Sequence, residues 1–214
     1  MKKLCSFLAS ILFLGSSLCV FASDENVNAI SISAAENNGY VTVQISSDFE
    51  SSGIQGVLTY DNMVLSYESS NLPDSITAYN ESNTTIKSTS EGIRYVMLSG
   101  TSGNKGEWVE MTFKLNNLTV TELPFSISNQ IASDSKGQKI TTEVIGAKII
   151  KKNGDVNSDG LVNIKDLIRI KKYFASLLGQ AKFSMLNADC NNDNSITSND
   201  MVYLRKSLLG IVTL

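Results

Sequence analysis

Oxygen-bearing side chains recur at the same positions in two segments near the C-terminus, residues 155–166 and 189–200. In both segments, Asp, Asn or Thr stands at positions 1, 3, 5, 9 and 12, which is the ligand spacing of a helix-flanked calcium loop. Calcium is a hard cation that takes six to eight oxygen ligands, so this residue chemistry suits it. The duplication therefore predicts two bound calcium ions, one in each loop.

The spacing also predicts the ligands of each ion. Side chains at positions 1, 3, 5 and 12 and the backbone carbonyl at position 7 bind directly, while position 9 acts through water. In the first loop these residues are Asp155, Asn157, Asp159, Leu161, Asn163 and Asp166. In the second loop they are Asp189, Asn191, Asp193, Ser195, Thr197 and Asp200. Magnesium fits less well, because it prefers to keep its waters.

Two details of the loops leave alternatives open. Positions 9 and 12 also match helix N-caps, so two polar turns before helices are the competing interpretation. Capping alone does not explain Asp at positions 1 and 5 with Asn at position 3 in both copies. Position 6 needs a sharp turn, which Gly160 provides, whereas Asn194 replaces glycine in the second loop at some conformational cost. We expect the second loop to be a variant with a looser hold on its ion or a distinct role.

The apolar spacing around the loops indicates the elements that position them. After residue 151 the apolar residues recur with the period of an α-helix, which predicts one helix behind each loop. The two predicted stripes are Leu167, Ile168, Ile170, Phe174, Leu177 and Leu178, and Met201, Val202, Leu204, Leu208 and Leu209. Before residue 151, short alternating apolar runs are separated by polar or glycine-containing turns, such as the one at 37–39. This pattern predicts roughly eight short strands, opening at 27–33, in an antiparallel β-sandwich.

The chain thus divides into three expected parts: a signal peptide at 1–22, the sandwich at 23–150 and the calcium-loop part at 151–214. Lys2 and Lys3 precede an apolar run that ends at the small-residue cleavage site 20–22, which is typical of a secretory signal. We therefore expect a secreted, extracellular protein whose mature form has no membrane span. Removal of the signal leaves Cys190 as the one cysteine, so no intramolecular disulfide can form. The linker at 151–154 is so short that we expect the two folded parts to touch.

Composition excludes several functions. The chain has no histidine, which removes Ser–His and Cys–His catalysis and most zinc sites. Its net charge of −3 without a basic patch argues against nucleic-acid binding. Glycoside hydrolases use paired carboxylates, but the acids of the sandwich part alternate outward or lie at turns without clustering. We therefore expect no enzymatic activity.

Residues 153–212 resemble the type I dockerin, the module that plugs enzymes into cellulosome-type scaffolds. The resemblance is carried by the non-helical residues 151–154 before the first loop, the Asp at position 12, and Lys171-Lys172 behind it. It implies a cohesin domain as partner, contacted through positions 10, 11, 17 and 18 of each repeat. These are Ile164, Lys165, Lys171 and Lys172 in the first repeat and Ser198, Asn199, Arg205 and Lys206 in the second. Since the pairs at positions 10 and 11 differ, one face should dominate; a merely solvated helix surface is the alternative.

Residues 24–150 resemble a cohesin in the stretches 54–65, 106–115 and 143–149. Strict alternation would turn Trp108 outward, but its family counterpart is a core aromatic, and a β-bulge would bring it inside. Carbohydrate-binding modules share the sandwich architecture, so the fold alone does not decide the function. The overall fold class predicted is mainly β with a small α part: a jelly-roll or cohesin-like antiparallel β-sandwich followed by a dockerin.

Two functions follow from these features. The first is a non-catalytic adaptor or scaffold subunit of a cellulosome-type, cell-surface complex that degrades polysaccharide. In this interpretation the dockerin part binds a cohesin through calcium, and the sandwich receives another, dockerin-bearing protein. The alternative is a carbohydrate-binding protein of the same complex, with polysaccharide as the ligand of the sandwich and the dockerin as its attachment.

Overall fold

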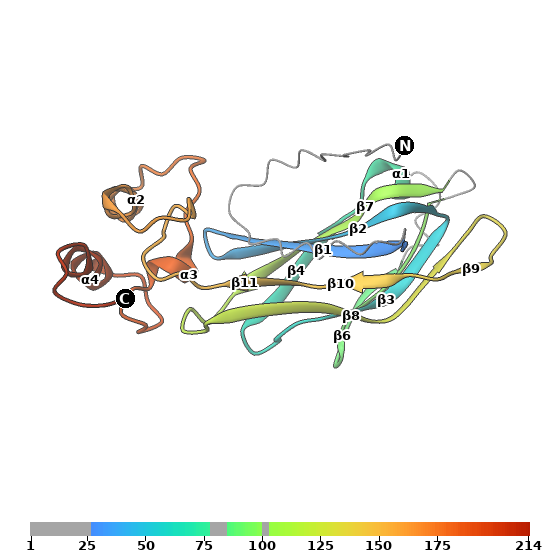
Figure 1. The fold of residues 1–214 in the computed structure, drawn as a ribbon, viewed down its shortest axis with the longest axis horizontal. Coiled ribbons are helices and arrows are strands. Elements are labelled where there is room, and N and C mark those ends of the chain that lie inside the picture. Colours follow the sequence, from blue (N-terminus) through green and yellow to red (C-terminus); the bar gives the residue numbers. More distant parts are fainter. Residues whose placement is uncertain (1–26, 78–84, 100–102) are drawn as a thin grey trace, which may run out of the picture.

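The computed structural model describes residues 27–77, 85–99 and 103–214, and the expected signal peptide at 1–22 lies outside them. Figure 1 shows two facing sheets with a smaller helical part at one end of them. The strands are β1 (Ala29–Asn37), β2 (Tyr40–Ser51), β3 (Gly53–Thr59), β4 (Leu65–Asn71), β5 (Thr85–Thr89), β6 (Gly92–Leu98), β7 (Asn104–Leu115), β8 (Glu122–Ser133), β9 (Lys139–Ile140), β10 (Glu143–Ile145) and β11 (Ala147–Ile150). The helices are α1 (Asp74–Thr77), α2 (Ile164–Phe174), α3 (Met185–Ala188) and α4 (Ser198–Leu208).

The predicted β-sandwich is confirmed, with one correction to its strand directions. One sheet has the order β10-β1-β2-β7-β4, and the other has β11-β8-β3-β6-β5 with β9 paired to β8. The pairings are antiparallel except that β1 and β10 run parallel. The closing segment at 143–149 is two strands in different sheets, divided at Gly146. A Cβ atom there would lie 2.9 Å from the Phe125 carbonyl oxygen, so glycine permits this close crossing.

The first hairpin corrects the expected opening strand at 27–33, which in fact reaches Asn37. Pairing between β1 and β2 continues until Asn37 lies opposite Tyr40. Asn38 and Gly39 between them both adopt positive φ, 54° and 81°. Such a two-residue turn matches the twist of the flanking strands and extends their pairing to the tip.

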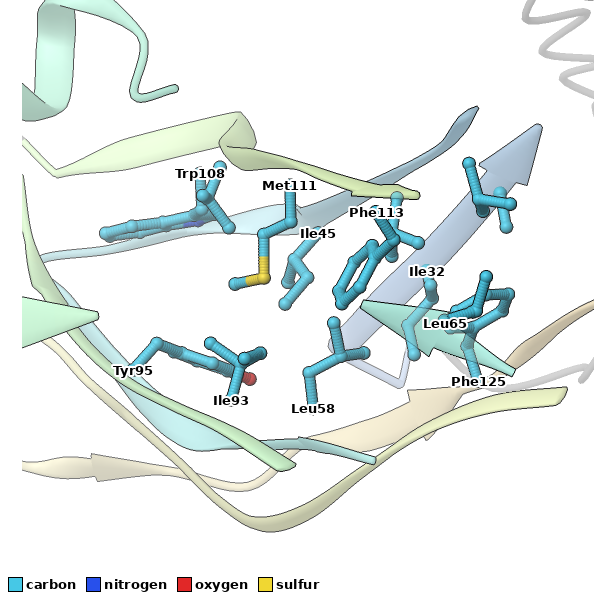
Figure 2. Packing of buried hydrophobic residues seen from close by; sticks show 14 of the residues in the cluster. Ile32, Ile45, Leu58, Leu65, Ile93, Tyr95, Trp108, Met111, Phe113 and Phe125 are labelled. Carbon is cyan, nitrogen blue, oxygen red and sulfur yellow. The ribbon is translucent and has the colours of Figure 1, made fainter. Parts of the chain in front are cut away.

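The core lies between the two sheets and follows the period-2 pattern of the strands. Figure 2 shows Ile45, Met111 and Phe113 of one sheet facing Leu58 and Ile93 of the other. These five side chains are fully buried. Each large apolar side chain buried in this way contributes about 1.5–3 kcal/mol, so this layer is the main source of stability for the sandwich.

Trp108 is fully buried, which confirms its expected place in the core. The pairing of β2 with β7 shifts between Ile45 and Ser46, and this irregularity lets Trp108 and its neighbour Val109 both face inward. The indole Nε1 donates a hydrogen bond of 3.0 Å to Ser47 Oγ. The tryptophan is therefore a satisfied core residue.

The C-terminal part contains a helix behind each loop, as predicted, but the first helix is shorter than its apolar stripe. It ends at Phe174, because Ser176 adopts a positive φ of 56°. Leu177 lies beyond that turn and is 70% exposed. Ile170 and Leu204, one from each of α2 and α4, are fully buried in a second, smaller core.

The two parts are packed against each other, as the short linker predicted. Leu186 of α3 is fully buried within the core cluster of the sandwich. The Asn38 amide at the tip of the first hairpin donates a 2.6 Å hydrogen bond to the Phe183 carbonyl, and Figure 1 shows this blue hairpin pointing at α3. Just after β11, the Lys151 amide donates to the Thr121 carbonyl at 2.8 Å. Among the described residues, no helix is long and apolar enough to cross a membrane.

Candidate calcium loops and docking surface

The first loop is organised by carboxylates that accept hydrogen bonds from its own backbone. Asp155 Oδ1 accepts from the Asp159 amide at 3.0 Å, and its Oδ2 accepts from the Gly160 amide at 3.0 Å. From the other end, Asp166 accepts from the amides of Asn157 at 3.1 Å and Asn163 at 2.8 Å. These bonds wrap the backbone around positions 1, 3, 5 and 12. Each carboxylate oxygen keeps a further lone pair with which it could bind a cation.

The second loop repeats this network with one added bond. Asp189 accepts from the amides of Asp193 at 3.0 Å and Asn194 at 3.1 Å. Asp200 accepts from the Thr197 amide at 2.8 Å and from the position-3 amide of Asn191 at 3.4 Å, and it also accepts from the Cys190 amide at 2.9 Å. In both loops the position-3 amide group donates to the position-5 carboxylate, at 3.0 Å in the first and 2.7 Å in the second. The two sequence copies therefore form two equivalent structures.

Both helices also carry the capping box that the alternative interpretation predicted. Asn163 caps α2 and Thr197 caps α4, and each exchanges hydrogen bonds with the Asp at position 12. Capping accounts for the residues at positions 9 and 12. It does not account for Asp155 or Asp189, which lie at the opposite end of each loop and hold the amides of positions 5 and 6.

The electrostatics of the loops suit a cation. The side chains of Asp166, Asp189 and Asp200 are fully buried, and Asp155 is 4% exposed. Burial raises the pKa of Asp166, and the neighbouring charges of Asp155 and Asp159 raise it further. Burial also raises the pKa of Asp189, against the lowering influence of Lys151. Buried carboxylates that repel one another are costly unless a cation compensates them.

The donors that could hold an ion are mixed oxygens. Within the described ranges, no group of three or more Asp, Glu, His or Cys side chains is gathered closely enough to bind a metal. The amide and hydroxyl oxygens at positions 3 and 9 and the carbonyls of Leu161 and Ser195 would therefore have to complete each site, as hard cations allow. Cys190 is no candidate, because burial raises the pKa of its thiol to about 12.

A groove of about 490 Å³ separates the first loop from the sandwich. Its lining includes Asp155 and Asp159 on one side and Ala34 and Ile149 on the other. The Lys152 ammonium lies 4.0 Å from Asp155 Oδ2 and donates to the Gly160 carbonyl. The first loop is thus open toward a groove, whereas the second loop contacts the sandwich directly.

The residues expected to contact a partner all lie on the outer surface of the C-terminal part. All eight are exposed: Ile164, Lys165, Lys171, Lys172, Ser198, Asn199, Arg205 and Lys206. Exposed apolar side chains accompany the first set, because Leu161, Ile164 and Ile168 are 63%, 59% and 49% exposed. On α4, Val202 and Leu208 are only 39% and 36% exposed. The two faces therefore differ in apolar surface as well as at positions 10 and 11.

Glu36 is a residue that the sequence reasoning missed. It belongs to β1 and is 5% exposed. Its Oε1 accepts from the Gly39 amide at 2.9 Å and the Met185 amide at 3.1 Å. Burial raises its pKa, although bonds from Ser184, Gly39 and Met185 oppose that rise. Glu36 occupies an inward-facing position of β1, where the alternation predicts an apolar residue, and this was the signal available in the sequence. The residue marks the junction of the two parts.

Comparisons with known proteins find different relatives for the two parts. The family model of the dockerin type I domain matches residues 153–209. No curated protein matches the chain. Among solved structures, the sixth cohesin of scaffoldin B from Acetivibrio cellulolyticus, solved in complex with a mutant dockerin, aligns with a TM-score of 0.50. It has 18% identity and covers 59% of this chain and 99% of its own.

Two further cohesin structures are similar at lower scores. A type I cohesin–dockerin complex from Clostridium thermocellum has a TM-score of 0.48 and 15% identity, covering 58% of this chain and 99% of its own. A cohesin from Clostridium acetobutylicum has a TM-score of 0.48 and 14% identity, covering 58% and 91%. The first alignment is the one that carries the fold assignment. Residues 153–209 thus match the type I dockerin domain, which is a calcium-binding type of module, and the sandwich before them has a cohesin-like fold.

Proposed function

We propose that this chain is a non-catalytic, secreted adaptor of a cellulosome-type complex at the cell surface. Its C-terminal dockerin, at 151–214, binds a cohesin of a scaffold protein, and its sandwich, at 23–150, receives the dockerin of another protein. The observation that carries the proposal is the presence of a dockerin domain and a cohesin-like sandwich in one chain. Both are non-catalytic types of module.

In this proposal each loop binds one calcium ion through the ligands that its spacing predicts. The buried carboxylates and the duplicated hydrogen-bond network support that assignment. When bound, calcium neutralises the carboxylates and fixes the loop at the start of the following helix. The chain's own residues then do the docking: α2 and α4 present their outer side chains to the cohesin.

The face formed by α2 dominates the contact with the cohesin. Leu161, Ile164 and Ile168 give it more exposed apolar surface than α4 has, and such surface typically marks a protein-binding site. The matched test is a pair of double variants, Lys171→Ala with Lys172→Ala against Arg205→Ala with Lys206→Ala. The first pair should weaken cohesin binding more than the second, and equal losses would contradict a dominant α2 face.

The sandwich receives its partner on the outer face of the β8-β3-β6 sheet. Ile131 lies opposite Gln55, and Gln55 lies opposite Val96, so the three form a row across three strands. Ile131 and Val96 are 41% and 36% exposed. A row of exposed aromatics, which sugar binding would need, is not seen on the described part of the sandwich, where Tyr40 is the exposed aromatic.

The test immobilises the full chain in calcium and offers it dockerin-bearing proteins and insoluble polysaccharides side by side. The adaptor proposal expects retention of a dockerin-bearing protein, and loss of that retention with Ile131→Asp. Gln138→Asp, at an exposed position just before β9, adds the same single negative charge and is the control. Retention of polysaccharide without any dockerin would instead support the carbohydrate-binding alternative.

A further inference from the structure

The two calcium loops have the same internal structure but different surroundings. At position 6 of the first loop, a Cβ atom on Gly160 would meet nothing within 4 Å. At position 6 of the second loop, Asn194 Oδ1 accepts a hydrogen bond of 2.6 Å from the Leu118 amide of the sandwich. The residue that departs from the loop pattern is therefore the one that reaches the other module.

This contact gives a physical reason for asparagine at position 194. Its φ is 66°, a left-handed conformation in which glycine would be less strained. The side chain compensates by satisfying the amide of Leu118, a residue that is 7% exposed and packs in the sandwich core. Without that acceptor, a largely buried N–H would lose its partner, which destabilises the junction.

Lys151 also links the second loop to Leu118, through the carbonyl of that residue. Its Nζ donates to the Leu118 carbonyl at 2.7 Å and to Asn192 Oδ1 at 2.6 Å. It also lies 3.8 Å from Asp189 Oδ2, and the side chains of Lys151 and Asp189 are 4% and 0% exposed. Both peptide groups of Leu118, its N–H and its C=O, are thus engaged by the second loop or by the lysine bound to it.

The atoms that make this contact are tied to the atoms that would hold the ion. Asp189 Oδ2 accepts from the Asn194 amide at 3.1 Å, so the carboxylate at position 1 sets the conformation of the docking residue. A cation held by Asp189 and Asp200 would relieve their mutual repulsion and preserve this geometry. If the ion favours this geometry, docking on the sandwich strengthens the hold on the ion in turn, because coupling between two binding events is reciprocal.

We propose that the second loop is a calcium-dependent docking element for the sandwich of the same chain, with the turn at 116–121 as its receiving surface. Asn194 is the residue that specifies this contact. The inference rests on calcium binding by the second loop, which is part of the proposed function. Calcium would then orient the dockerin relative to the sandwich, in addition to folding the loops.

The experiment measures amide hydrogen exchange of Leu118 and calcium stoichiometry on the full chain, with and without a chelator. Asn194→Gly keeps a residue suited to position 6 and removes the contact. Gly160→Asn makes the reverse change in the first loop, where the side chain meets open space, and is the matched control. Fluorescence of Trp108 checks that the sandwich is folded in each variant.

Chelation should speed exchange of the Leu118 amide in the wild type by about tenfold or more, as expected when a local opening becomes easier. Asn194→Gly should exchange fast at Leu118 even with two ions bound, while Gly160→Asn should behave like the wild type. This inference alone would be overturned if the chain binds two ions but the exchange rate of the Leu118 amide changes neither on chelation nor in Asn194→Gly. Binding of a single ion, with the second loop empty, would overturn the inference together with the second calcium site.

Discussion

Leu186 allows a quantitative test of how firmly the two modules are joined. The side chain comes from α3 of the C-terminal part, is 0% exposed, and lies in the core cluster of the sandwich. Leu186→Ala deletes three buried carbon atoms and leaves a cavity at the junction, which typically costs 2–5 kcal/mol, or about 3 kcal/mol here. For a chain of this size, that loss lowers the melting temperature by roughly 6–12 °C.

Two probes report on the two modules separately. Trp108 is the one tryptophan of the chain and lies in the sandwich core, so its fluorescence follows unfolding of the sandwich. Far-UV circular dichroism at helical wavelengths follows α2 and α4. We expect Leu186→Ala to lower the midpoints of both signals in calcium, because the side chain belongs to α3 of the C-terminal part and is buried in the core of the sandwich.

Leu204→Ala is the control. It deletes the same atoms at a position that is also 0% exposed but belongs to the smaller C-terminal core. It should lower the helical midpoint by a similar amount and the Trp108 midpoint by clearly less. If Leu186→Ala leaves the Trp108 midpoint unchanged, the argument for a shared core at the junction is refuted.

Three further predictions concern single interactions. Ser47→Ala removes the acceptor of the Trp108 indole and should destabilise the sandwich by about 1–3 kcal/mol, measured by urea unfolding; a change within experimental error would contradict the buried bond. Glu36 has a raised pKa, so its contribution to stability is fully present below the unfolded value of 4.5 and is lost as pH rises through the folded pKa. The unfolding free energy of the wild type relative to Glu36→Gln should therefore fall as pH rises from 4.5 to neutrality in calcium, and a constant difference would contradict the cause given for the shift. Chelation of calcium should reduce helicity at 164–174 and 198–208, because ion binding is coupled to folding. Unchanged helicity after the chelator is added would count against the assignment of the loops as calcium sites.

The local features of this chain were predictable from its sequence. The spacing of oxygen side chains, the helix starts at Ile164 and Ser198, and the turn at 37–39 each depend on a few neighbouring residues. The inward position of Trp108 was also accessible, because a bulge reconciles its chemistry with the alternation of β7. Short-range patterns and hydrophobic burial act on the same residues in these places, so both lead to the same structure.

Features that join distant segments were not predictable in the same way. Asn194 departs from the loop pattern and suggested a weaker ion site, but its partner, Leu118, stands 76 positions earlier in the chain. The parallel pairing of β10 with β1 depends on a crossing at Gly146, and nothing in the local pattern distinguishes that glycine from an ordinary turn residue. Such contacts depend on how segments that are distant in the sequence pack in the folded chain, which the spacing of neighbouring residues does not encode.

The central claim is that the C-terminal module docks on a cohesin through calcium-organised loops. Its most direct test is calorimetric titration of the full chain with a panel of type I cohesins, in calcium and in chelator. We predict saturable binding to at least one cohesin in calcium, and loss of that binding both in chelator and in the Asp155→Ala, Asp189→Ala double variant. Equal affinity with and without calcium, or no binding to any cohesin of the panel by a chain that holds two ions, would contradict the account.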